Sequence, residues 1–201
     1  GMLRDKVALV TGAGRGIGRA HALEFARHFR IPVVQHAQDL DLSGEGVMHE
    51  GVASACCGLP GIPGAAEDVM VARDLILTED SGGRYHVAHI STARALGLVR
   101  EAKARGLDVT CEVTPHHLLL DDRAVTASGF DANFKMQPPL RGESDAAALV
   151  AGLVDGTVDA IASDHAPVGR PLAVKYRPSS VSIRSISSGP VPESAAASPA
   201  G

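Results

Sequence analysis

Three short apolar runs of this chain end in side chains that can bind a metal ion or move a proton. His36 ends the run PVVQH, His89 ends YHVAH, and Asp164 follows VDAIA after a single serine. Catalytic groups of α/β barrels are carried at the carboxyl ends of buried strands. Imidazole nitrogen and carboxylate oxygen both suit zinc and similar divalent ions. The three residues are therefore candidate ligands of one metal site.

Each of these residues also has an ordinary explanation. A histidine at a strand end can simply donate one hydrogen bond, and Asp164 can be the N-cap of a helix beside a turn. Because alternate side chains share one face of a strand, His36 is expected beside Val34, and His89 beside Val87. We therefore expect the candidate ligands to lie on otherwise apolar faces, at the mouth of a packed barrel interior.

Strand and helix patterns alternate along the chain and would position these residues. We expect strands over residues 6–10, 32–36, 85–90, 108–113 and 158–162, and helices over residues 17–29, 65–79, 92–105 and 144–154. Between them, residues 37–64 hold six glycines and two prolines with little periodicity, which predicts a long loop. Strands separated by helices predict a parallel sheet with right-handed crossovers.

Composition excludes several classes of function. The chain has 201 residues, which suits one domain, and 45% of them are hydrophobic. A net charge of −4 gives no basic surface for nucleic acid. No apolar window is long enough for a membrane span, and the first residues show no signal-peptide pattern. Three cysteines without paired spacing favour a reduced, cytoplasmic setting.

Six blocks of the chain, in order, carry a resemblance to a known family; they read PVVQHAQD, GLPGIP, YHVAHIST, EVTPHH, PPLR and SDHAP. On these blocks, residues 22–167 resemble the C-terminal half of a dihydroorotase, one of the metal-dependent (β/α)8 barrels of the amidohydrolase superfamily. The resemblance implies an α/β fold that is a partial TIM-type barrel of this kind. It also implies a cytoplasmic hydrolase of pyrimidine biosynthesis, with dihydroorotate or carbamoyl aspartate as its small-molecule substrate.

The same resemblance implies roles for four residues. His36, His89 and Asp164 stand at the positions of metal ligands, with Zn2+ or another divalent ion as the cofactor. Asp164 also stands at the position of the catalytic group that carries a proton between the attacking water and the leaving amide nitrogen. In such enzymes the ion lowers the pKa of that water and polarises the carbonyl oxygen. Gln137 stands where the family has a substrate-binding asparagine.

The chain also departs from the family pattern. The family's His-x-His pair and its bridging carboxylate or carboxylated lysine have no counterpart before His36, and Val168 replaces a second histidine after SDHAP. We therefore expect one metal site at most, and weak activity or none in this chain alone. An open barrel leaves unpaired strand edges, so we expect it to oligomerise or to be completed by another chain. The alternative is a non-catalytic chimeric or fragment protein.

A second resemblance covers the first residues of the chain. Residues 2–20 contain VTGAGRGIG and resemble the opening of a short-chain dehydrogenase/reductase, in which a glycine-rich turn approaches a dinucleotide pyrophosphate. We therefore expect a grafted Rossmann-like βα unit over residues 1–21, and an NAD(P)-binding reductase is the third functional interpretation. That family's Tyr-x-x-x-Lys pair is absent, since His89 follows Tyr85 and Ser180 follows Tyr176 at this spacing. We expect no cofactor-binding residues there.

The end of the chain differs from the rest in composition. Residues 168–201 hold eight serines and five prolines without sustained periodicity, which predicts a disordered tail. The predicted organisation is thus a βα unit over 1–21, a partial amidohydrolase barrel over 22–167, and this tail.

Overall fold

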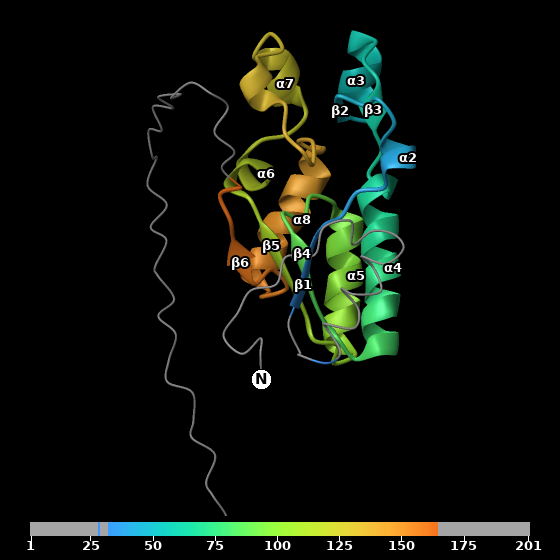
Figure 1. The fold of residues 1–201 in the computed structure, drawn as a ribbon. Helices are drawn as coiled ribbons and strands as arrows, with labels where there is room; N and C mark the ends of the chain where they lie inside the picture. Colours follow the sequence, from blue (N-terminus) through green and yellow to red (C-terminus); the bar gives the residue numbers. More distant parts are fainter. Residues whose placement is uncertain (1–27, 29–31, 165–201) are drawn as a thin grey trace, which may run out of the picture. The chain divides into compact units, whose positions relative to one another are not determined.

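The computed structural model describes residue 28 and residues 32–164 (Figure 1). The chain divides into two units, residues 1–165 and 166–201, and the second lies outside the described residues. The predicted βα unit over 1–21 and the predicted tail over 168–201 also lie outside them. Within the described part, no helix combines the length and the apolar character that crossing a membrane requires.

Strands and helices alternate through the described part. The strands are β1 (Pro32–His36), β2 (Met48–His49), β3 (Gly61–Ile62), β4 (Arg84–Ala88), β5 (Val109–Val113) and β6 (Ala160–Ile161). The helices are α2 (Leu40–Ser43), α3 (Val52–Cys57), α4 (Ala65–Ser81), α5 (Ala93–Ala104), α6 (Pro115–Leu119), α7 (Arg123–Ala127), the 3-10 helix η1 (Ala132–Phe134) and α8 (Glu143–Val154).

The main sheet is parallel and has the strand order β1-β4-β5-β6. In register, His36 pairs with Ala88, so β1 and β4 end at the same edge of the sheet. A separate two-stranded parallel sheet joins β2 to β3. The predicted α/β class with parallel pairing is confirmed. The carboxyl ends of neighbouring strands therefore lie together, as the sequence interpretation required.

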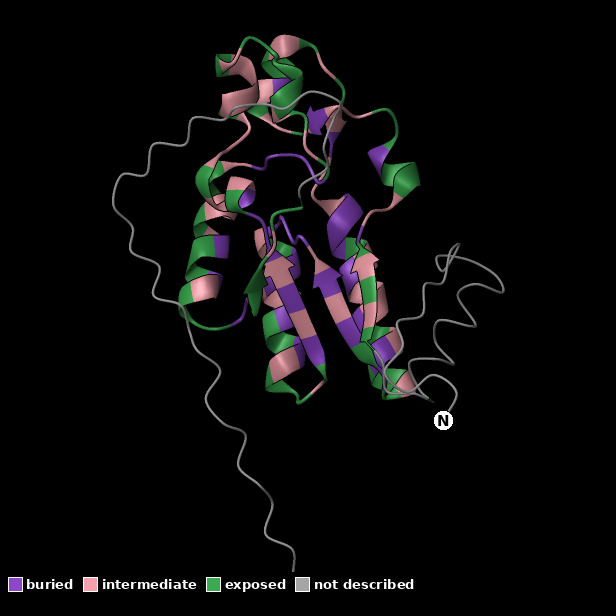
Figure 2. Ribbon diagram, turned by 60° about the vertical axis from the view of Figure 1, so that its left-hand side comes forward, coloured by how far each residue is buried: buried purple, intermediate pink, exposed green. Residues whose placement is uncertain are grey.

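The hydrophobic core lies between this sheet and helices α4, α5 and α8. Alternate residues of β4 and β5, namely Tyr85, Val87, Val109, Cys111 and Val113, are buried against those helices. The opposite face of the strands is less buried, and Figure 2 shows the resulting alternation of buried and partly buried bands along the strands. On that face, Nε2 of His86 on β4 lies 3.3 Å from Oε2 of Glu112 on β5.

The sequence predicted the long helices from their apolar spacing and from the residues at their ends. Thr92 caps α5 by accepting a hydrogen bond from the backbone N–H of Ala95 at 3.1 Å. Helix α4 ends at Gly82, whose φ of 63° suits glycine. The predicted helices over 65–79, 92–105 and 144–154 are confirmed with shifts of one or two residues at their ends.

Three sequence expectations are wrong. Residues 37–64 are not a long loop, because they form α2, β2, α3 and β3. The expected strand over 85–90 ends early because His89 has φ of 36° and leaves the extended conformation. The face assignment is wrong for the same reason: Val87 is fully buried against the helices, whereas the ring of His89 reaches His36, which lies on the other face.

Candidate active site

Two histidines meet at the carboxyl ends of β1 and β4. Nδ1 of His36 lies 2.9 Å from Nε2 of His89, and the rings meet edge to face with centroids 4.6 Å apart. His36 is the last residue of β1, and the left-handed backbone of His89 directs its ring across the strand end. The structure therefore brings together two of the three predicted metal ligands.

A chain of amide side chains continues from this histidine pair. Nε2 of His36 lies 2.8 Å from Oε1 of Gln38, and Nε2 of Gln137 donates to the same oxygen at 2.6 Å. The predicted substrate-binding residue is therefore linked to the histidine pair through Gln38. Sequence reasoning gave Gln38 no role, although it lies two residues after His36.

Asp164 lies near the same strand ends. It is exposed, has φ of 44°, and is close enough for its charge to act on His89 and on His116. The described residues contain no group of three His, Cys, Asp or Glu side chains already placed to hold a metal ion. The structure thus joins His36 to His89 and places Asp164 nearby, and the three-ligand set stays a prediction.

The facing nitrogens of His36 and His89 suit a cation. Two nitrogens bound to one zinc ion at about 2.0–2.1 Å are about 2.9–3.4 Å apart for right to tetrahedral angles. The observed 2.9 Å separation falls in this range. Nδ1 of His89 is buried without a hydrogen-bond partner. If that atom carries the ring proton, two lone pairs face each other, and a cation between them relieves the repulsion. The pair therefore fits two ligands of a divalent ion.

Burial and neighbouring charges shift the pKa values of two histidines at the site, His89 and His116. Burial lowers the pKa of His89, and the neighbouring His36 lowers it further, while Asp164 raises it. Burial also lowers the pKa of His116. Only a neutral imidazole has a lone pair for a metal ion, so the lowered pKa of His89 favours its role as a ligand.

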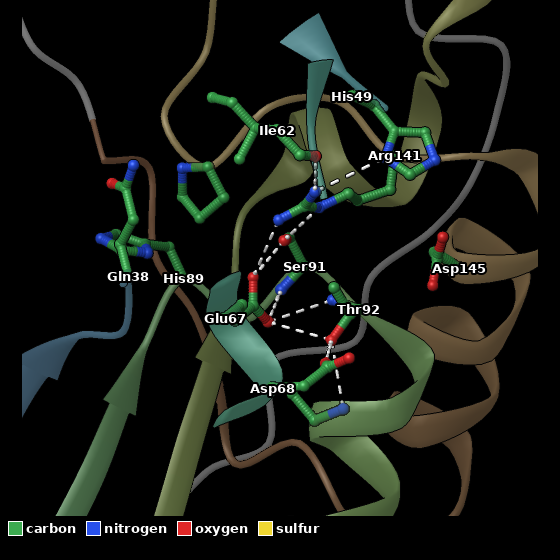
Figure 3. Close-up of polar contacts among 12 residues, drawn as sticks. Gln38, His49, Ile62, Glu67, Asp68, His89, Ser91, Thr92, Arg141 and Asp145 are labelled. Atoms are coloured by element: carbon green, nitrogen blue, oxygen red, sulfur yellow. Dashed lines mark hydrogen bonds and ion pairs between the residues drawn. The ribbon is translucent and has the colours of Figure 1, made fainter. Parts of the chain in front are cut away.

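A buried ionic network lies beside the site (Figure 3). Glu67 at the start of α4 accepts the backbone N–H groups of Ser91 and Thr92 at 2.9 and 3.1 Å, and the Ser91 hydroxyl also bonds to it. Nη2 of Arg141 lies 3.7 Å from Oε2 of Glu67, and both side chains are 3% exposed. Arg141 also donates to the Ile62 carbonyl at 2.9 Å.

This network connects the segments that carry the site. Ser91 and Thr92 follow His89 by two and three residues, and Arg141 follows Gln137 by four. Burial raises the pKa of the Glu67 carboxyl, and the guanidinium of Arg141 acts against this. The sequence gave one signal for this network, because Arg141 belongs to the PPLR block. Glu67 carried no signal beyond a favourable place in the first turn of its helix.

A second anchor holds the Gln137 segment from the other side. His117 is buried; its Nδ1 lies 2.7 Å from Oγ1 of Thr114, and its Nε2 lies 3.1 Å from the carbonyl oxygen of Pro138. Burial, together with the neighbouring His116, lowers the pKa of His117 to about 3. His117 is therefore a neutral structural residue, whereas its neighbour His116 lies within electrostatic range of Asp164.

Comparison with known proteins finds the same family that the sequence blocks suggest. A family model described as dihydro-orotase-like matches residues 13–95. The dihydroorotase of Anaeromyxobacter dehalogenans (strain 2CP-C) is 61% identical over 146 residues, which are 73% of this chain. Over these residues the chain is dihydroorotase-like. The sequence prediction on this point is confirmed, and the family match includes part of the segment 1–21 that resembles a reductase.

Other dihydroorotases match this chain at lower sequence identity. The dihydroorotase of Pelotomaculum thermopropionicum is 54% identical over 146 residues. The dihydroorotase of Syntrophobacter fumaroxidans is 51% identical over 163 residues, which are 79% of this chain and 36% of that protein. The chain spans about a third of the length of the curated dihydroorotases that it matches. The dihydroorotase-like stretch therefore corresponds to part of those proteins.

Solved structures of related enzymes share the fold of this stretch. The dihydropyrimidinase from Brevibacillus agri superposes with a TM-score of 0.61 at 25% identity, covering 73% of this chain and 33% of that one. The D-hydantoinase from Bacillus sp. AR9 gives a TM-score of 0.61 at 26% identity, covering 73% and 34%. The parallel sheet and its helices thus match part of those TIM-barrel structures.

Proposed function

We propose that this dihydroorotase-like chain carries part of the active site of a metal-dependent cyclic amide hydrolase of pyrimidine biosynthesis. Dihydroorotate or carbamoyl aspartate is the proposed substrate. The observation that carries the proposal is the pair of imidazole nitrogens, 2.9 Å apart, at the ends of two adjacent parallel strands. Similarity to dihydroorotases over 146 residues supplies the substrate class.

The residues divide the work by their chemistry. His36 and His89 hold one divalent ion, proposed to be Zn2+, and Asp164 is the third ligand. A bound ion of this kind lowers the pKa of water and polarises a carbonyl oxygen. Asp164 accepts the proton of the attacking water and delivers it to the leaving amide nitrogen. Gln137 binds the substrate through its amide group.

Metal binding gives the first test. The full 201-residue chain is dialysed against Zn2+ and then against buffer, and bound metal is measured by elemental analysis and by titration calorimetry. We expect no more than one weakly held ion, lost in both His36→Ala and His89→Ala. The control is His86→Ala, which removes a histidine of β4 that already contacts the Thr110 hydroxyl at 2.8 Å. Two tightly held ions, or binding indifferent to His36 and His89, would overturn the proposal.

Assembly is proposed from the sheet. In the described part, β1 and β6 are the outer strands of the order β1-β4-β5-β6, and each pairs on one side. Val34 on β1 is 62% exposed. Another chain, or a second copy of this one, is proposed to cover these edges and supply the remaining site residues. A monomer by light scattering with measurable hydrolysis of dihydroorotate would contradict this.

The proposal also covers location, and it has two functional alternatives. A cytoplasmic location rests on the three free cysteines, of which Cys111 is buried. The non-catalytic alternative predicts no hydrolysis even when a partner is supplied. An NAD(P)-binding role would rest on residues 1–21, which lie outside the described residues, and no described residue supports it.

A further inference from the structure

Four hydrogen-bonded side chains lead from a backbone carbonyl to the candidate metal site. The Ser43 hydroxyl donates to the carbonyl of Asp39 at 2.7 Å, and Nε2 of Gln38 donates to Oγ of Ser43 at 2.9 Å. Oε1 of Gln38 faces Nε2 of His36 at 2.8 Å, and Nδ1 of His36 faces His89 at 2.9 Å.

Local structure explains why these side chains meet. Asp39 caps α2, its side chain accepting the N–H groups of Asp41 and Leu42 at 3.0 Å. Helix α2 is a single turn, so it returns Ser43 to the start of the helix, where it lies against Gln38. The sequence His36-x-Gln38-Asp39 therefore builds a strand end, a hydrogen-bond acceptor and a helix cap in four residues.

The direction of the first three bonds in this chain, from the Asp39 carbonyl to His36, is determined. A serine hydroxyl has one proton, and that of Ser43 goes to a carbonyl that can only accept. Oγ of Ser43 must then accept from Gln38, which points the amide NH2 of Gln38 to Ser43 and its oxygen to His36. Because an amide oxygen only accepts, Nε2 of His36 carries the proton. In a neutral ring, Nδ1 of His36 then keeps its lone pair.

We propose that Gln38 is a positioning residue that holds His36 with its Nε2–H bound and its Nδ1 lone pair directed at His89. The side chain acts through His36 and touches neither metal nor substrate. Hydrogen bonds to the far nitrogen of a metal-bound histidine fix its ring orientation, and removing such a partner commonly costs about 10- to 100-fold in metal affinity. The metal part of this inference rests on the proposed function, whereas the state of the His36 ring does not.

The test compares replacements of Gln38 in the full chain. Gln38→Leu keeps the approximate size and removes the acceptor, and Gln38→Glu keeps an oxygen in place. The control Gln35→Leu removes a glutamine one residue before His36, where it accepts from the Tyr85 hydroxyl at 3.2 Å. Imidazole NMR with 15N-labelled histidine follows the Nε2–H of His36 without metal. Calorimetry with Zn2+ follows affinity.

We expect Gln38→Leu to lose the downfield-shifted Nε2–H signal of His36 and about 10-fold or more of the zinc affinity. Gln38→Glu should keep both, and Gln35→Leu should change neither. Ser43→Ala should give an intermediate result, because the amide NH2 of Gln38 then loses its acceptor, while Gln137 still donates to the amide oxygen at 2.6 Å. An unchanged His36 signal in Gln38→Leu would overturn the inference. If His36→Ala leaves zinc affinity unchanged while the NMR result holds, the proposed function fails and the positioning role stands.

Discussion

The buried pair of Glu67 and Arg141 allows a quantitative test of what holds the site segments together. In Glu67→Gln the shape is kept and the negative charge is removed. The new oxygen can still accept the N–H groups of Ser91 and Thr92, which now bond to Glu67 at 2.9 and 3.1 Å. The change therefore isolates the charge that faces Arg141.

Burial sets the expected size of the effect. Both side chains are 3% exposed, so the guanidinium of Arg141 would be left in the interior without its nearest carboxylate. Leaving one member of a buried ion pair uncompensated costs about 3–5 kcal/mol. Because Arg141 keeps its bonds to the Ile62 carbonyl and the Ser91 hydroxyl, we expect a loss of about 3 kcal/mol in the free energy of unfolding. Adding Arg141→Met to Glu67→Gln removes the stranded charge and should recover part of this loss.

The assay is urea unfolding of the full chain at neutral pH, followed by far-ultraviolet circular dichroism because the chain has no tryptophan. The control is Asp108→Asn, which breaks the pair of Arg84 and Asp108. That pair is closer, at 2.8 Å, but its side chains are 45% and 47% exposed, so its loss should cost at most about 1 kcal/mol. Equal losses of unfolding free energy in Glu67→Gln and Asp108→Asn would refute the reasoning. A lower stability of the double variant Glu67→Gln/Arg141→Met than of Glu67→Gln alone would also refute it.

Three further variants test titration and packing. The pKa of His117 is lowered to about 3, so between about pH 6.5 and 3 the unfolded chain binds a proton that the folded chain does not. The free energy of unfolding should therefore decrease as the pH is lowered through this window, by up to about 1.4 kcal/mol per pH unit. Urea unfolding of His117→Gln should show a smaller dependence on pH. A Cβ on Gly152 would lie 2.7 Å from Leu96, so Gly152→Val should cost about 1–3 kcal/mol, whereas Gly97→Ala, with open space around it, should stabilise by up to about 1 kcal/mol in thermal melts.

Much of the sheet could be predicted because its signals are local. The run PVVQH forms β1 with the expected bounds, and the long helices α4, α5 and α8 follow from apolar spacing and caps. Residues 37–64 could not be read in the same way. Helices α2 and α3 have four and six residues, and β2 and β3 have two each, so none is long enough to show a period. Helix α2 depends on its cap, Asp39, and the strands β2 and β3 depend on pairing with each other.

The site could be predicted as residue types but not as geometry. His36 and His89 were found because each ends an apolar strand, and their contact follows from parallel pairing. The backbone turn that brings the ring of His89 to His36 could not be predicted, because nothing in the sequence marks a non-glycine residue with φ of 36°. Glu67 and Arg141 lie 74 positions apart in numbering, and such contacts have no local signal.

The unpredicted features are physically related. A left-handed histidine costs of order 1–3 kcal/mol, and it persists only where neighbouring contacts determine it. Here the contacts come two and three residues later, where the N–H groups of Ser91 and Thr92 are bound by the buried carboxylate of Glu67. That carboxylate tolerates burial because Arg141 faces it, and Arg141 ends the segment that carries Gln137. The charge pair therefore fixes the backbone that turns the ring of His89 toward His36, whereas a continued strand would direct this ring to the other face.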